Sequence, residues 1–315
     1  MWEIIARIFP YAIAFTIPLL ITALGGLFSE RSGVVNIGLE GLMIVGSFTS
    51  AVVIRFLQPS LGTSAIYLAL LAAMAAGALF SVLHAFACVN LNANQVISGT
   101  AINMIALALT VFLARNITGS GNITIKTGLI RFDVPILSQI PILGKLFFTQ
   151  VYWSTPIVLF ILLASWFVIE QTPFGLRLRA CGENPHAADS MGINVYRMRY
   201  AGVLLSGAFA GLGGAIILVT YSGEFTGSVF GLGFLALASL IFGQWRPLGI
   251  LGATFFFGLF STIANVSQAI PQFAVIPGVI LKVFPYIVTL AALVLSSKSS
   301  QAPRASGQPF EHGKR

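Results

Sequence analysis

The chain has 315 residues, of which 57% are hydrophobic and 8% are charged, and its mean hydropathy is +0.93. This composition excludes a soluble domain, because repeated apolar runs of about 20 residues are long enough to cross a bilayer. In a soluble protein, a net charge of +8 would indicate a nucleic-acid partner. Here the basic residues lie in loops and in the tail, where the positive-inside bias and anionic membrane lipid account for them, so no nucleic-acid binding is expected.

Long apolar segments recur along the whole chain. We distinguish nine, and the count becomes ten if one of the short or glycine-broken segments is a half-helix or a re-entrant turn. The expected fold is therefore all-α, a polytopic transmembrane helical bundle of about nine or ten spans, some of them broken. The predicted spans are residues 4–24, 34–56, 64–87, 96–115, 152–170, 200–220, 231–243, 248–268 and 283–297.

A polar stretch interrupts the apolar pattern between residues 25 and 48, where Glu30, Arg31, Asn36 and Glu40 lie among glycines. Polar groups at membrane depth persist only where they face protein or a water-filled path. Glu40 is the one acidic residue that we place inside a predicted span. It is either a buried hinge, hydrogen-bonded to neighbouring groups, or a carboxylate on a transport path.

Amide side chains also occur inside predicted spans, for example Asn103 and Asn265. Such amides hold helices together more often than they bind solute, because an unpaired amide in hydrocarbon costs free energy. Asn103 is kept as a candidate for the solute path. Two cysteines and three histidines give no metal-ligand pattern, so neither a metal nor another cofactor is expected.

The polar segment Cys181–Ile193 carries the start and stop signals of a short helix. Asn184 can cap the free N–H groups, and Pro185 fits the first helical position, where its missing donor costs nothing. About two turns are expected, ending at Gly192, which can adopt the left-handed conformation. Because this helix lies between two spans, a partner outside the membrane could dock on it and so move the membrane part. The residues between the cap and the stop are His186, Ala187, Ala188 and Asp189.

The arginines around this helix place it on the cytoplasmic side. Four of them lie within 23 residues, so the loop at 171–200 is predicted to face inward. By alternation, the loops at 116–151 and 221–230 face outward, and the tail after Ser297 faces inward. This tail, 298–315, is rich in Pro, Ser and Gly and lacks periodicity, which predicts disorder. The four arginines are Arg177, Arg179, Arg197 and Arg199.

A second glycine-rich stretch, Ser222–Gly249, places glycines before a short apolar segment and a basic turn at Arg246. Glycine-interrupted segments in corresponding halves point to the substrate path of transporters built from repeats. The similarity between the two stretches is weak, so it serves only as a pointer. It makes Gly231 and Gly233 candidates for that path.

Several motifs are missing. The sequence has no GxxxxGK[ST] loop, so this chain is not expected to hydrolyse nucleotide by itself. It also has no nucleophile elbow, no metal-binding His/Glu helix and no buried carboxylate pair, which disfavours a membrane-embedded enzyme. A secondary carrier driven by an ion gradient would normally have more intramembrane charge than one glutamate.

Four stretches carry a resemblance to a known family. They are ERSGVVNIGLEGLMIVGSF at 30–48, ACGENPHAADSMGI at 180–193, FGQWRPLG at 242–249 and FPYIVTL at 284–290. Together they resemble the permease subunits of ABC importers, in the branched-chain amino acid and simple sugar permease family, and most of all its nucleoside-type permeases. The motifs extend to about Ser297 and occur in the family's order and spacing.

This resemblance implies a helical transmembrane domain over residues 1–297 with an internal pseudo-two-fold repeat, in the bacterial cytoplasmic membrane. Two permease subunits, often two different ones, pair around the solute path. ATP is bound by a partner ATP-binding cassette subunit, and an extracytoplasmic substrate-binding protein delivers the solute. The expected cargo is nucleosides. The alternatives are a simple sugar permease or a self-sufficient secondary carrier.

The resemblance also assigns roles to two groups of residues. The first would form the coupling helix that docks on the ATP-binding subunit, in the cytoplasmic loop at 171–200. The second would line or support the solute path. The coupling helix would comprise Glu183, Asn184, Pro185, His186, Ala187, Ala188, Asp189 and Gly192, and the path group Asn36, Gly38, Glu40 and Gly41, to which we add Asn103, Gly231 and Gly233.

Overall fold

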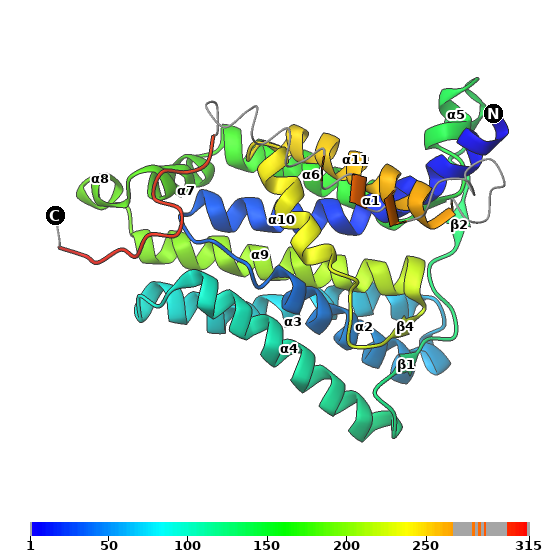
Figure 1. Ribbon diagram of the computed structural model, residues 1–315, viewed down its shortest axis with the longest axis horizontal. Coiled ribbons are helices and arrows are strands. Elements are labelled where there is room, and N and C mark those ends of the chain that lie inside the picture. Colours follow the sequence, from blue (N-terminus) through cyan, green and yellow to red (C-terminus); the bar gives the residue numbers. More distant parts are fainter. Residues whose placement is uncertain (1, 267–278, 281–282, 285–286, 288–300, 314–315) are drawn as a thin grey trace.

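The computed structural model describes residues 2–266, 279–280, 283–284, 287 and 301–313. Within this part, seven helices are long and apolar enough to cross a membrane (Figure 1). The helices α3 and α9 each continue into one π-helical turn, Phe86–Asn90 and Leu218–Ser222. The seven are α1 (Trp2–Arg31), α2 (Leu39–Leu61), α3 (Ser64–Ala85), α4 (Gln95–Thr118), α6 (Ser154–Gln171), α9 (Val195–Ile217) and α11 (Pro247–Val266).

The predicted spans agree with these helices in order and position, and the predicted all-α transmembrane bundle is confirmed. The predicted span at 231–243 is the short helix α10, Leu232–Phe242. Its 11 residues extend only about 16 Å, half of the hydrocarbon thickness, so α10 is a half-helix. The predicted span at 283–297 lies mostly outside the described residues, and the internal repeat stays a prediction.

Short elements occupy the two ends of the bundle. The strands β1 (Ile123–Thr124) and β4 (Glu224–Phe225) pair antiparallel, as do β2 (Arg131–Phe132) and β3 (Val151–Tyr152). The β1–β4 pair joins the two loops predicted to face outward, so both lie at the same end. Figure 1 shows β1, β2, β4 and α5 at the end opposite α8. The remaining helices are a 3-10 turn at Leu137–Gln139, α5 (Leu143–Phe147), α7 (Pro173–Glu183) and α8 (Pro185–Ser190).

Helix α9 lies at the centre of the bundle and packs against α1, α2 and α3. Glycines make this close approach possible. A Cβ added at Gly46 of α2 would lie 2.0 Å from the carbonyl oxygen of Gly211, and one at Gly77 of α3 would lie 2.2 Å from that of Gly207. Small residues at helix interfaces let backbones touch in a membrane, where the hydrophobic effect does not drive helices together.

Other helices present large apolar side chains outward. Met104 and Phe112 of α4 and Phe160 of α6 are all more than 60% exposed. On a chain with seven helices of membrane-spanning length, such side chains face lipid or another membrane subunit.

The C-terminal tail differs from the sequence-based expectation. Disorder was expected from residue 298 onward, but residues 301–313 pack on the end of the bundle that carries α8 (Figure 1). The segment has turns and no regular helix. Its Ala305 and Phe310 are nevertheless buried, at 4% and 2% exposure. A few apolar anchors therefore fix a segment whose average composition is polar.

We predict that Gly46→Ala lowers the stability of the protein, because the added methyl group would collide with the backbone of α9. Overpacking of this kind costs about 1–3 kcal/mol. The midpoint of thermal unfolding in detergent measures the effect. Gly252→Ala in α11 is the matched control, since a Cβ there meets no atom within 4 Å. Equal midpoints for the two variants would contradict the glycine contact.

Candidate functional site

The short polar helix predicted from the sequence is present as α8. The Oδ1 atom of Asn184 accepts a hydrogen bond from the N–H of Ala187 at 3.0 Å, and Pro185 occupies the first turn. Gly192 has a φ of +79°, and its N–H donates to the carbonyl oxygen of Asp189 at 2.9 Å. The predicted start and stop of the helix are therefore confirmed.

Helix α8 has a buried face and an exposed face. Pro185 and Ala188 point inward, and Ala188 belongs to an apolar cluster with Cys181, Val195 and Phe310. Figure 1 places α8 at one end of the molecule, where a partner can reach its outer side. The exposed residues on and around this side are Glu183, Asn184, His186, Ala187, Ser190, Met191 and Gly192.

The elements that flank α8 are firmly attached to the bundle. The side chain of Thr172 caps α7, and that of Asn194 caps α9. A Cβ at Gly182 would lie 2.4 Å from the carbonyl oxygen of Arg31, so the end of α7 touches the end of α1. Burial raises the pKa of the Cys181 thiol to about 11, so it packs here as a neutral side chain.

The polar loop before α2 is held against α9 by Asn36. This side chain is fully buried, and its Nδ2 donates to the hydroxyl of Ser206 at 2.9 Å. Its Oδ1 accepts a hydrogen bond from the N–H of Gly38 at 3.1 Å. Each polar atom of the amide is thus paired, as burial in a membrane protein requires.

Glu40 connects the start of α2 to the start of α10. Its Oε1 accepts a hydrogen bond from the N–H of Gly231 at 2.9 Å, and its Oε2 accepts one from Gly233 at 2.7 Å. A Cβ at Gly233 would lie 2.3 Å from the backbone nitrogen of Glu40, so only glycine allows this approach. The free N–H groups and partial positive charge at a helix start favour a carboxylate there. Both oxygens are used in this way, which fits the interpretation of Glu40 as a buried hinge.

Asn103 ties α4 to the same region. Its Oδ1 accepts a hydrogen bond from the N–H of Gly41 at 2.7 Å, and its Nδ2 donates to the carbonyl oxygen of Ile37 at 3.1 Å. The amide therefore holds two helices together. All seven residues named for the path lie in one network around the starts of α2 and α10: Asn36, Gly38, Glu40, Gly41, Asn103, Gly231 and Gly233.

Sequence reasoning missed a contact between two of the motif stretches. The indole N–H of Trp245 donates to the Glu30 carboxylate, and the Arg31 guanidinium donates to the carbonyl oxygen of Trp245 at 2.8 Å. The end of α1 is thereby bonded to the turn between α10 and α11. Only the position of both stretches at the ends of their spans that are predicted to face the cytoplasm could have indicated this pair.

A cavity of about 340 Å³ lies beside the start of α10. Its lining is aromatic with a few polar groups. The rings of Phe15 and Tyr221 meet edge to face, with centroids 6.0 Å apart, and the Asn265 amide donates to the Tyr221 hydroxyl at 3.4 Å. The lining residues are Phe15, Tyr221, Phe230, Leu232, Leu235, Ser261 and Asn265.

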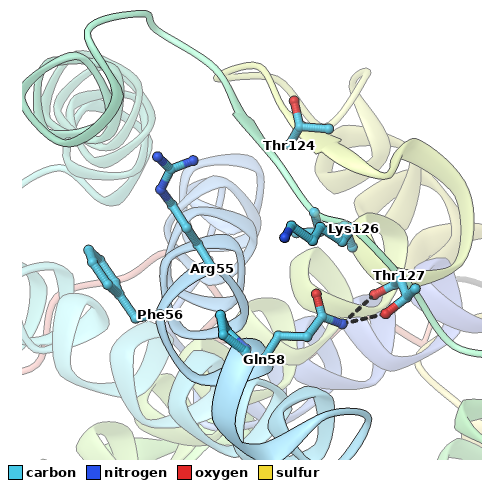
Figure 2. A pocket seen from close by; sticks show the side chains of 8 residues that line it. Arg55, Phe56, Gln58, Thr124, Lys126 and Thr127 are labelled. Carbon is cyan, nitrogen blue, oxygen red and sulfur yellow. Dashed lines mark hydrogen bonds between the residues drawn. The ribbon is translucent and has the colours of Figure 1, made fainter.

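A second cavity, of about 490 Å³, opens at the outer end of α2 (Figure 2). The amide of Gln58 donates to the carbonyl oxygen of Thr127 at 3.0 Å and to its hydroxyl, which fixes the outer loop against α2. Figure 2 shows Arg55 and Lys126 beside this contact. Neither cation has an ion pair among the residues that the structure describes.

Together, these features define a multi-pass membrane transport protein: long apolar helices, one half-helix that starts at a buried carboxylate, and a capped polar helix at one end. Comparison with known protein families shows which family of transport proteins the chain belongs to. The family described as "Branched-chain amino acid transport system / permease component" matches residues 8–293, and the chain belongs to this family. It is thus a permease subunit of an ABC transporter, a multi-pass protein of the cytoplasmic membrane.

Several relatives match most of the chain. The guanosine ABC transporter permease protein NupQ of Bacillus subtilis is 48% identical, over 99% of both chains. The nucleoside ABC transporter permease protein NupC of Lactococcus lactis is 45% identical, over 93% of both. The putative glucose ABC transporter permease protein TsgC13 of Haloferax volcanii is 33% identical, over 87% of both. The nucleoside permeases are thus more similar to this chain than the sugar permease is.

We predict that Glu40→Gln destabilises the protein, because a glutamine amide has one acceptor oxygen for the two N–H groups of Gly231 and Gly233. A buried donor without its partner costs about 1–3 kcal/mol. The thermal midpoint and the amount of protein in the membrane measure this loss.

The matched control for this variant is Glu224→Gln in the outer strand β4, where the side chain is partly exposed. Lost transport by Glu40→Gln at an unchanged midpoint and protein level would contradict the hinge. It would support a carboxylate on the transport path.

Proposed function

We propose that this chain is one of two membrane-spanning subunits of an ATP-driven importer of nucleosides. The observation that carries the proposal is α8, a capped and exposed helix at the end of the bundle that the arginine-rich loop predicts to face the cytoplasm. The proposed cargo follows from the names of the relatives NupQ and NupC, which match nearly the full chain.

The proposed partners follow from the division of labour in ABC importers. An ATP-binding subunit would bind the exposed side of α8 and hold the nucleotide, because this sequence has no phosphate-binding loop. The chain would then be a transport subunit without catalytic residues or a cofactor of its own. A second, different permease subunit would complete the solute path.

The extracytoplasmic partner in this proposal is a substrate-binding protein. The cavity at the outer end of α2 offers two cations, Arg55 and Lys126, beside neutral polar groups (Figure 2). Carboxylates on the binding protein would complement this charge and orient it on the permease.

The proposed mechanism is alternating access. Closure of the ATP-binding subunits would move α8, and the movement would pass through α7 and α9, which enclose it. The start of α10 is the place where a change can open a path, because the half-helix begins inside the membrane at the Glu40 contact. ATP supplies the free-energy difference between the inward- and outward-facing states.

The cavity beside the start of α10 suits a nucleoside. Its aromatic side chains offer flat apolar surfaces for a base, and Asn265, Ser261 and the Tyr221 hydroxyl offer hydrogen bonds for neutral polar groups. A nucleoside is uncharged, so it needs no fixed charge in its path. A simple sugar lacks the planar base that would use these rings.

The role of α8 can be tested with Ala187→Trp. The exposed position allows the larger side chain to be accommodated without harm to the fold, but the indole ring would obstruct the docking surface. We predict normal membrane insertion and loss of solute-stimulated ATPase activity in the assembled transporter. Ala187→Ser, which keeps the residue small, is the control. Wild-type stimulation of the ATPase in the tryptophan variant would refute the docking role.

The proposed cargo site can be tested with Tyr221→Ala. Stacking on an aromatic side chain contributes about 1–3 kcal/mol per base, so the KM for nucleoside uptake should rise about tenfold at an unchanged protein level. Tyr67→Ala is the control, because Tyr67 lies on the outer face of α3 and is 43% exposed. An unchanged KM for Tyr221→Ala would place the solute path elsewhere.

A further inference from the structure

The C-terminal segment, residues 301–313, lies against the short helix α8. Figure 1 shows it in red, passing α7 on its way to the end of the bundle that carries α8. The imidazole of His312 is 2.8 Å from the carboxylate of Asp189 in α8, measured from Nδ1 to Oδ2. We call this segment the C-terminal clamp.

Phe310 is the main anchor of the clamp. Its side chain is 2% exposed and packs with Cys181, Ala188 and Val195, which come from α7, α8 and α9. Its ring centroid lies 5.2 Å from that of His186 and 5.6 Å from that of Tyr196. One aromatic ring thus fills the corner where α8 turns back to α9.

The same ring covers a buried cation. Arg199 of α9 is 1% exposed, and its guanidinium carbon lies 5.9 Å from the centroid of Phe310. The Nε and Nη2 atoms of Arg199 have no hydrogen-bond partner among the described residues. The face of an aromatic ring attracts a cation more strongly where water is excluded, so Phe310 also stabilises this charge.

The clamp reaches beyond α8 to three loops at the same end. The N–H of Ala305 donates to the carbonyl oxygen of Gly182 at 2.9 Å, and that of Gly307 donates to Gly33 at 3.2 Å. The Asn92 amide donates to the carboxylate of Glu311 at 3.4 Å, and the Arg246 guanidinium donates to Gln301 at 2.8 Å. The loops after α1, α3 and α10 are therefore all bonded to the clamp.

Helix α8 needs such support. It has six residues, and an isolated helix of this length is unstable in water. The residues of its own inner face, Pro185 and Ala188, are small. Phe310 supplies the large apolar surface on which this face rests.

We propose that the C-terminal clamp fixes α8 to the loops that lead into α2 and α4, and that Phe310 and His312 are positioning residues for energy coupling. This inference rests on the proposed function, in which α8 receives the movement of the ATP-binding subunit. With the clamp in place, a displacement of α8 is passed to Gly33, and from there to Asn36 and the Glu40 contact. Without the clamp, α8 moves or unfolds independently of these loops, and less of its displacement reaches α10.

The test compares Phe310→Ala with wild type in the transporter assembled with its own partner subunits in proteoliposomes. Hydrogen exchange of the α8 amides should become about tenfold faster or more. The number of guanosine molecules transported per ATP hydrolysed should fall about fivefold or more, while the KM for guanosine and the amount of co-purified ATP-binding subunit stay unchanged.

Two further variants keep this test interpretable. Gln308→Ala is the matched control, because Gln308 is exposed and its side-chain amide donates within the clamp, to the carbonyl oxygen of Arg304. His312→Ala should change exchange and coupling in the same direction as Phe310→Ala, to a smaller extent. It keeps the proposal testable if Phe310→Ala does not fold.

Unchanged exchange in α8 would overturn the clamp, and so would faster exchange with wild-type transport per ATP. Loss of the ATP-binding subunit on purification would also overturn it, since the tail would then be a docking surface itself. Absence of ATP-dependent uptake by the wild-type transporter would instead refute the proposed function. The exchange comparison would still decide whether the tail holds α8.

Discussion

The contact between the Glu40 carboxylate and the start of α10 is the constraint on which the membrane part depends. A helix that begins inside a bilayer has free N–H groups and no water to bond them. Glu40 accepts hydrogen bonds from two of these groups, at Gly231 and Gly233. These glycines follow Glu40 in the chain by 191 and 193 positions. Glycine at 233 is required because the two backbones touch. The polar stretch before α2 and the glycine-rich stretch before α10 thus complete each other, and neither would be stable at this depth alone.

A second set of contacts links this region to the end of the bundle that carries α8. Gly33 is bonded to the C-terminal clamp, Asn36 is bonded to Ser206 of α9, and Glu30 and Arg31 are bonded to Trp245 after α10. Helix α8 therefore sits on a framework that leads to both ends of α10. In the proposed mechanism, this arrangement lets the six-residue helix α8 influence the half-helix α10. The glycine contacts of α9 with α2 and α3 make the framework stiff, because closely packed backbones leave no room for independent movement.

The sequence predicted those features whose causes are local. Asn184, Pro185 and Gly192 define α8 through their own backbone preferences, and apolar runs define the long helices. It also identified the residues of the Glu40 network, but not the bonds between them, because pairing across the chain has no local signal. The tail was misjudged for a related reason. Its composition is polar on average, but its position is set by single apolar side chains such as Phe310. Such a side chain can be buried only where α7, α8 and α9 come together and offer apolar contacts.

The most direct test of the account is the uptake of labelled nucleosides and of labelled ribose or galactose by cells with and without this chain. Each measurement is repeated with cellular ATP depleted and the ion gradient maintained. The account predicts nucleoside uptake that requires both the chain and ATP, because in the proposed mechanism α8 transmits movement from an ATP-binding subunit. Sugar uptake in place of nucleoside uptake would contradict the proposed cargo. Nucleoside uptake that depends on the chain and persists without ATP would contradict the coupling role of α8 and the mechanism built on it.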